Sequence, residues 1–313
     1  MTMTSTASVS VILAPNAALA RAALEKGVAL TVEAEYGAFV AEGAVYTAAH
    51  HQATGKYQGR HTGGEAPAPC NDRDIPVCSP GDTILLSHLD LDSVGGALRG
   101  LGVEGLFGPA TQGFWSAAEF VDTNGAHRLA KDHRERLALG AWWAWLSEHR
   151  PKPDHKNVTD ITEFVFQCEK VLTTLLHGGA DQEVLLKKGQ DFLDNEETLN
   201  RESLIGTVTT KSGILAMRAS NGFVNHLYAL DEGVADAVLA LNTTTGSVTL
   251  SFEDGGKRFN AREIVQSIWT ERDAEGNFLA GGHPGIAGSP RGLVLTHADL
   301  GRALGVLVSG PLS

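Results

Sequence analysis

The stretch Thr83-Ile84-Leu85-Leu86-Ser87 runs directly into His88-Leu89-Asp90-Leu91-Asp92-Ser93. Its first part is short, apolar and preceded by a Pro-Gly pair, which is typical of a buried strand. In extended backbone, alternate side chains lie on one face, so His88, Asp90 and Asp92 are expected to converge at the strand's C-terminal end. Open α/β sheets bind ligands at that edge, and clustered carboxylates call for a neutralising cation. The stretch therefore predicts a divalent metal site, with an acidic turn at a strand end as the plainer alternative.

The composition is that of an ordinary globular protein. The chain has 313 residues, of which 42% are hydrophobic and 20% charged, and this length is sufficient for two domains with separate cores. Its formal net charge of −12 argues against the broad basic surface that long duplex nucleic acid requires. A small anionic substrate stays compatible with this charge, because a bound metal supplies local positive charge.

The number and spacing of the cysteines and the length of the apolar segments indicate the cellular compartment of the protein. Cys70, Cys78 and Cys168 have neither a disulfide framework nor a zinc-knuckle spacing, which suits a reducing cytoplasm. Residues 9–20 are mildly apolar, but no Lys or Arg precedes Arg21, so we favour a strand running into a helix over a secretory signal. No apolar run approaches the ~20 residues that span a bilayer. We therefore expect a cytoplasmic protein that does not bind membranes.

Two domains are expected along the chain. In the first we predict strands over 9–13, 83–87 and 117–121, Ala-rich helical sequence after the first strand to about residue 42, and helices over 94–101, 129–149 and 159–177. An exposed connection with its own helix follows over 178–203. The sequence pattern then changes: we predict strands over 204–208, 214–218, 237–241 and 247–252, and helices over 261–270 and 297–308. Thr296 is the expected N-cap of the last helix.

The predicted fold class is accordingly α/β. We expect an N-terminal doubly wound, mainly parallel sheet domain over 1–180 that binds metal and catalyses the reaction. A linker helix over 181–203 leads to a smaller C-terminal α+β domain over 204–313 that binds substrate.

Asp122 is the second candidate metal ligand. It follows the predicted strand 117–121 as Asp92 follows its own strand, and parallel neighbouring strands would bring the two carboxylates together. His127, Asp132 and His133 come shortly after it. Each of them could equally be a solvated helix residue, but Asp92, His127 and His133 are the candidate catalytic groups.

A Gly- and Pro-rich stretch over 47–80 carries three histidines. Such a long irregular stretch inside a domain is often functional. His50 and His51 are candidate metal ligands, and Arg60 and His61 are candidate contacts to an anionic substrate. A surface loop with incidental histidines is the alternative.

The glycine cluster Gly281-Gly282-His283-Pro284-Gly285-Ile286-Ala287-Gly288 is the third candidate site. Glycines let the backbone approach a ligand closely and present N–H groups to anionic oxygens. Gly282, His283 and the nearby Arg291 are therefore the candidate substrate contacts of the second domain. A plain Gly-rich hairpin is the alternative.

Together, the motif His88-x-Asp90-x-Asp92-Ser93 and the later Gly-Gly-His-Pro-x-x-Ala-Gly run resemble the DHH phosphoesterase superfamily. That group includes RecJ-like exonucleases, oligoribonuclease and phosphoadenosine phosphatases, cyclic-dinucleotide phosphodiesterases and family II pyrophosphatases. By motif order the resemblance spans most of the chain. It implies an N-terminal domain that holds two Mn²⁺-type ions through His88, Asp90, Asp92 and Asp122. It also implies a small C-terminal domain that grips a phosphate through the region of Gly282 and His283.

The chain departs from this family at its name motif, because a literal Asp-His-His is absent. Asp122 with His127, or Asp132-His133-Arg134, could be its remnant. Mixed N/O ligands suit manganese, with cobalt, zinc and ferrous iron as alternatives.

We expect a metal-dependent hydrolase of a small phosphomonoester or short oligonucleotide that uses metal-activated water. Hydrolysis of a C–N or another non-phosphate bond on the same scaffold is one alternative, because fold alone does not fix chemistry. A non-catalytic nucleotide-binding protein is the other. The expected partner is a small anionic substrate, and a homodimer is compatible with the sequence.

Overall fold

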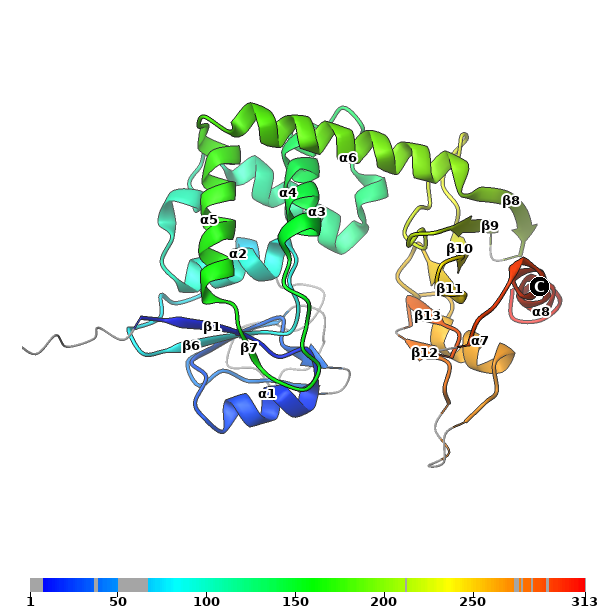
Figure 1. The fold of residues 1–313 in the computed structure, drawn as a ribbon, viewed down its shortest axis with the longest axis horizontal. Coiled ribbons are helices and arrows are strands. Elements are labelled where there is room, and N and C mark those ends of the chain that lie inside the picture. The colour runs from blue at the N-terminus through cyan, green and yellow to red at the C-terminus, as the bar shows by residue number, and fades with distance from the viewer. Residues whose placement is uncertain are drawn as a thin grey trace, which may run out of the picture. The chain divides into compact units, whose positions relative to one another are not determined.

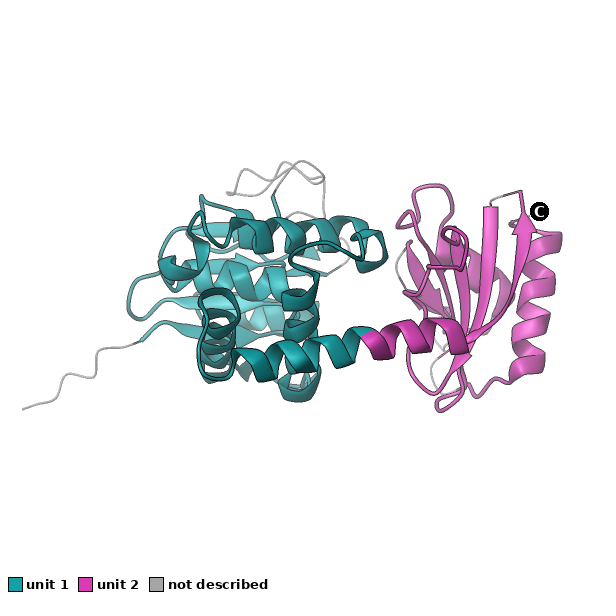
Figure 2. Cartoon of the chain, turned by 90° about the horizontal axis from the view of Figure 1, so that it is seen from above, with its two compact units in different colours: residues 1–193 teal, residues 194–313 magenta. Residues whose placement is uncertain are grey.

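The computed structural model describes residues 8–36, 39–49, 67–211, 213–272, 276, 278–282, 284–290 and 293–312. The chain divides into two compact units, residues 1–193 and residues 194–313, which Figure 2 colours separately. Both are mixed α/β: unit 1 contains a largely parallel sheet, and unit 2 contains a separate, largely antiparallel sheet. The helix α6 (Gln182–Glu202) begins in unit 1 and ends in unit 2.

The sheet of unit 1 has the strand order β5-β2-β6-β1-β7. Figure 1 labels β6, β1 and β7 of this sheet. The first four strands are parallel, and β7 pairs antiparallel with β1. Their bounds are β1 Ser10–Leu13, β2 Leu30–Val32, β5 Tyr46–Ala48, β6 Thr83–Leu86 and β7 Thr159–Asp160. A separate hairpin joins β3 (Glu35–Tyr36) to β4 (Phe39–Val40).

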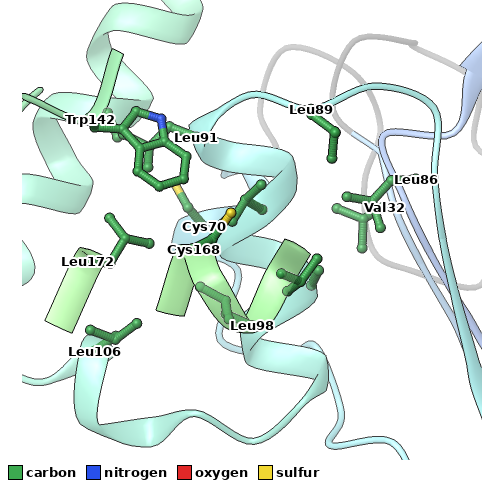
Figure 3. Close-up of a cluster of buried hydrophobic side chains, with 14 of the residues drawn as sticks. Val32, Cys70, Leu86, Leu89, Leu91, Leu98, Leu106, Trp142, Cys168 and Leu172 are labelled. Atoms are coloured by element: carbon green, nitrogen blue, oxygen red, sulfur yellow. The ribbon is translucent and has the colours of Figure 1, made fainter. Parts of the chain in front are cut away.

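Helices cover both faces of this sheet because successive strand side chains alternate between the faces. One core forms under the helices α2 Leu91–Gly100, α3 Gln112–Asn124, α4 Arg136–His149 and α5 Thr162–His177. Figure 3 shows this core, with Val32 and Leu86 from the sheet and Leu98 from α2. The other face packs against α1 (Ala17–Leu24) and the β3–β4 hairpin. Short 3₁₀ helices lie at η1 Pro69–Asn71, η2 Glu104–Phe107 and η3 Ala126–Arg128.

The sheet of unit 2 has the order β12-β13-β11-β10-β9-β8, in which only the β9–β10 pair is parallel. Its strands are β8 Leu204–Thr210, β9 Gly213–Ser220, β10 Ala237–Asn242, β11 Ser247–Phe252, β12 Gly281–Gly282 and β13 Ile286–Gly288. The helices α7 (Ala261–Ile268) and α8 (His297–Ser309) pack on one face. Thr296 caps α8 in a capping box with Asp299, which confirms the predicted N-cap.

The predicted strand over 117–121 is wrong. These residues lie in α3, where Phe114, Trp115, Ala117 and Ala118 are buried. Their spacing of one, three and four residues is that of one helix face, and alanine favours a helix. Asp122 therefore projects from a helix and does not follow a strand.

The predicted helical sequence after the first strand does form a helix, but its extension to about residue 42 is wrong. The helix α1 ends at Leu24, and Gly27 turns the chain with a φ of +91°. The β-branched residues that follow then form β2 beside β6. In the part of the chain that the structure describes, no helix is both long and apolar enough to cross a membrane.

Candidate metal centre

The candidate site lies where two neighbouring parallel strands end. In the ladder between β2 and β6, Val32 is paired with Leu86, the last residue of each strand. Glu33 follows the first strand, and Ser87 and His88 follow the second. The parallel pairing therefore places Glu33 and His88 at the same sheet edge, and α2 begins beside them.

Glu33 has an unusual backbone and a buried carboxylate. Its φ is +48°, in the left-handed region, and its side chain is 0% exposed. The backbone is held there because its N–H donates to the carbonyl of Ala48 (2.8 Å) and its carbonyl accepts from the N–H of Glu35 (2.8 Å) and from Ser87 Oγ. A left-handed residue other than glycine is uncommon and often marks a functional site.

Glu33, His88 and Asp90 form the first ligand group, in which one donor atom of each residue lies within 4.8 Å of the others. His88 Nε2 is 2.7 Å from Asp90 Oδ2 and 3.3 Å from Glu33 Oε2. His88 Nδ1 is 2.7 Å from Ser87 Oγ. Burial alone would lower the pKa of His88, but the carboxylates of Asp90 and Glu33 outweigh it and raise that pKa well above its usual value. The two carboxylates thus favour the protonated form of the imidazole.

Glu33, Asp92 and Asp122 form the second ligand group, again with donor atoms within 4.8 Å of one another. Glu33 and Asp92 are buried, whereas Asp122 is partly exposed on α3. Glu33 is therefore common to both groups. It joins the ligands at the strand ends to those on two helices.

The predicted placement of Asp92 on one face of extended backbone with His88 and Asp90 is wrong. The strand β6 ends at Leu86, and Asp90 is the N-cap of α2. Asp90 Oδ1 accepts from the N–H of Ser93 and Ser93 Oγ accepts from the N–H of Asp90, both at 3.1 Å. With this capping box the helix begins at Leu91. Asp92 therefore lies in the first turn of α2, where it belongs to the second group.

The donor chemistry fits divalent cations. The two groups together offer one imidazole nitrogen and four carboxylates, two of which are buried. Such N/O sets suit Mn²⁺, Fe²⁺, Co²⁺ or Zn²⁺. Clustered carboxylates also repel one another until a cation compensates them. The residues present could therefore hold one ion in each group.

Comparisons with known proteins find only distant likenesses. No family model and no curated protein matches the chain. Among solved structures, the pGpG-specific phosphodiesterase PggH of Vibrio cholerae is 10% identical, with a TM-score of 0.38 over 75% of this chain and 80% of that one. An uncharacterized protein from Helicobacter pylori G27 is 12% identical, with a TM-score of 0.25 over 72% of this chain and 68% of that one. At these TM-scores neither likeness carries an argument, so the superfamily resemblance stays a prediction.

Among the described residues, the other predicted site residues are not part of the two groups. His127 lies in η3, directly after α3, and His133 Nδ1 accepts from the N–H of Glu135 at 3.2 Å. Gly282 ends β12 with a φ of +152°, and a Cβ there would lie 2.5 Å from the carbonyl oxygen of Ile286, so the position requires glycine. The other candidates lie outside the described residues: His50, His51, Arg60, His61, His283 and Arg291.

Sequence reasoning did not find Glu33. A signal was present, because Leu30-Thr31-Val32 is an apolar, β-branched run followed at once by an acidic residue. That is the same pattern that identifies the stretch from Thr83 to Asp90. Reading residues up to 42 as a helix concealed it.

Proposed function

We propose that this chain is a metal-dependent phosphoesterase that hydrolyses a small phosphomonoester or a short oligonucleotide. The observation that carries the proposal is the pair of ligand groups that share Glu33. Glu33 would contribute its carboxylate to both groups if each held a cation. We favour Mn²⁺ because the ligands combine an imidazole with several carboxylates.

Each ligand residue has a definite part in this proposal. Divalent cations held by these residues would acidify a water molecule and stabilise negative charge on a phosphate ester. Glu33 would contribute to both ligand groups, and Asp92 and Asp122 would be the other ligands of the second group. His88 is held by Ser87 Oγ at its other ring nitrogen, which fixes the plane of the imidazole.

The phosphate specificity rests on the two motifs at residues 88–93 and 281–288 that resemble the DHH superfamily. We propose Gly282, His283 and Arg291 as substrate contacts of the second domain, and Arg60 and His61 as those of the first. His50 and His51 would add metal ligands. Asp92, His127 and His133 are the proposed catalytic groups. Of the two histidines, His127 follows the helix that carries Asp122.

Metal analysis and phosphate release test this function. The purified chain is assayed with Mn²⁺, Co²⁺ or Zn²⁺ against phosphomonoesters, dinucleotides and short oligonucleotides. Asp92→Asn is the active-site variant, and the exposed Asp181→Asn is a control with the same change of charge. We expect metal-dependent phosphate release that Asp92→Asn loses and Asp181→Asn keeps. Bound metal without turnover of any phosphate ester would contradict the phosphoesterase proposal.

A further inference from the structure

A short segment, η1, packs against both of the helices that supply the second ligand group, and the two helices also contact each other directly. Asp92 lies in the first turn of α2 and Asp122 near the end of α3. The segment η1 and the residue before it, Ala68, contact both helices. The contacts of η1 with each helix therefore contribute to the spacing between Asp92 and Asp122.

The contact of η1 with α2 is close and rigid. A Cβ on Gly95 would lie 2.5 Å from Cys70 Cβ, and a Cβ on Gly96 would lie 2.7 Å from Pro69 Cβ. Arg99 Nε also donates to the carbonyl of Cys70 at 2.7 Å. Only glycines allow this approach, so η1 packs closely against the helix that carries Asp92.

The contact of η1 with α3 is made by polar side chains. The amide nitrogen of Asn71 donates to Glu119 Oε2 at 2.6 Å and to the carbonyl of Trp115 at 3.0 Å, while its oxygen accepts from Gln112 Nε2 at 3.3 Å. The second oxygen of Glu119, Oε1, accepts from the N–H of Ala68 at 3.1 Å. Both oxygens of the Glu119 carboxylate therefore accept hydrogen bonds from the segment 68–71.

Glu119 and Asp122 are three residues apart on α3, so they lie on neighbouring positions of one helix face. The face of α3 that is hydrogen-bonded to η1 through Glu119 is thus the face that carries the metal ligand Asp122. Cys70 of η1 is close to all of these groups: burial, followed by the charges of Asp92, Glu119 and Asp122, raises the pKa of its thiol.

We propose that Glu119 and Asn71 are positioning residues for the second ligand group. Their hydrogen bonds fix α3 against η1, so that Asp122 meets Asp92 and Glu33 at metal-binding spacing. This inference rests on the proposed function, since it concerns the same metal site. Neither residue belongs to the two ligand groups, and both act through Asp122.

The test is a calorimetric Mn²⁺ titration of the full chain. Glu119→Gln keeps the shape of the side chain but replaces one acceptor by an N–H₂ that faces a donor. We expect it to weaken one of two Mn²⁺ sites about tenfold, as loss of an outer hydrogen-bond partner typically does, and to leave the other unchanged. Glu183→Gln, the same change of residue at an exposed position of α6, is the control and should bind both ions like the wild type.

The same change in an Asp122→Asn background separates positioning from general damage. If Glu119 acts through Asp122, Glu119→Gln causes no further loss once that carboxylate is gone. Asn71→Ser removes the hydrogen bonds of the Asn71 side-chain amide to α3. This variant replaces Glu119→Gln in the experiments if Glu119→Gln does not fold. Wild-type affinity at both sites, or an equal loss in the Asp122→Asn background, would overturn the inference. Absence of Mn²⁺ binding by the wild type would instead reject the proposed function.

Discussion

Oε2 of Glu33 lies 3.3 Å from Nε2 of His88, and the two residues follow adjacent parallel strands. The side chain of Glu33 is 0% exposed, whereas that of His88 is 48% exposed. A buried carboxylate is costly unless a cation or a proton compensates it. The half-exposed imidazole supplies that compensation from the solvent side. A divalent cation entering the first ligand group would take over the same role.

The two ligand groups should respond separately to substitution. We expect His88→Ala to weaken the binding of one Mn²⁺ ion and Asp122→Asn that of the other, because each variant removes a donor from only one group. Each loss should be at least the roughly tenfold loss that removal of an outer hydrogen-bond partner causes. Equilibrium dialysis with metal analysis would measure this, with Asp181→Asn as the control. Loss of both ions from either variant alone would show that the groups do not act as separate sites.

The thiols should report on the packing around η1. Cys70 and Cys168 are buried, while Cys78 is partly exposed. Burial, with a smaller effect from Asp82, raises the pKa of Cys78 to about 11. Because the thiolate is the reactive form, the reaction of Cys78 with a disulfide reagent should be slow at neutral pH and accelerate as the pH rises towards that value.

Cys70 and Cys168 should react only on unfolding, because burial raises the pKa of both thiols and shields them. Counting the released chromophore in native and urea-unfolded protein at each pH measures this. Rapid reaction of all three thiols in the native protein would contradict the packing of η1 under α2.

Two glycine substitutions should have opposite effects on stability. Gly189 of α6 packs on α4, and a Cβ there would lie 2.5 Å from the backbone nitrogen of Ala141. Gly189→Ala should therefore cost about 1–3 kcal/mol of unfolding free energy through overpacking. Urea unfolding followed by tryptophan fluorescence is suitable, since four of the five tryptophans lie in unit 1: Trp115, Trp142, Trp143 and Trp145.

Gly301 is the matched control because it is also helical, in α8, but a Cβ there would meet nothing within 4 Å. Gly301→Ala should stabilise unit 2 by about 0.5–1 kcal/mol through the lower backbone entropy of alanine. Circular dichroism during urea unfolding measures both variants. An unchanged stability of Gly189→Ala would show that α4 and α6 can move apart.

Local signals made a large part of the fold predictable from the sequence. The strands β1, β6, β10 and β11 and the helix α8 lie where apolar runs and a capping residue predict them. The helix α3 was not predictable in this way, because the five residues from Ala117 to Val121 fit both a strand and a helix face. Its identity depends on packing against η1 and the core.

The candidate site depends on contacts that a local pattern does not contain. Glu33 follows a strand of only three residues, and it reaches His88 because β2 pairs with β6, more than fifty residues later along the chain. Asp122 joins Asp92 through the placement of α3 beside α2, not through neighbouring strand ends. His88 and Asp90 were the residues whose proximity could be predicted, since they are two positions apart.

The number of Mn²⁺ ions bound per chain, compared between the wild type and Glu33→Gln, tests the central claim most directly. Glu33 is common to both ligand groups, so its carboxylate should be needed for both ions. We expect two ions in the wild type and neither bound at the same Mn²⁺ concentration in Glu33→Gln, with thermal unfolding showing that the variant is folded. A folded Glu33→Gln variant that still binds two ions would contradict the account.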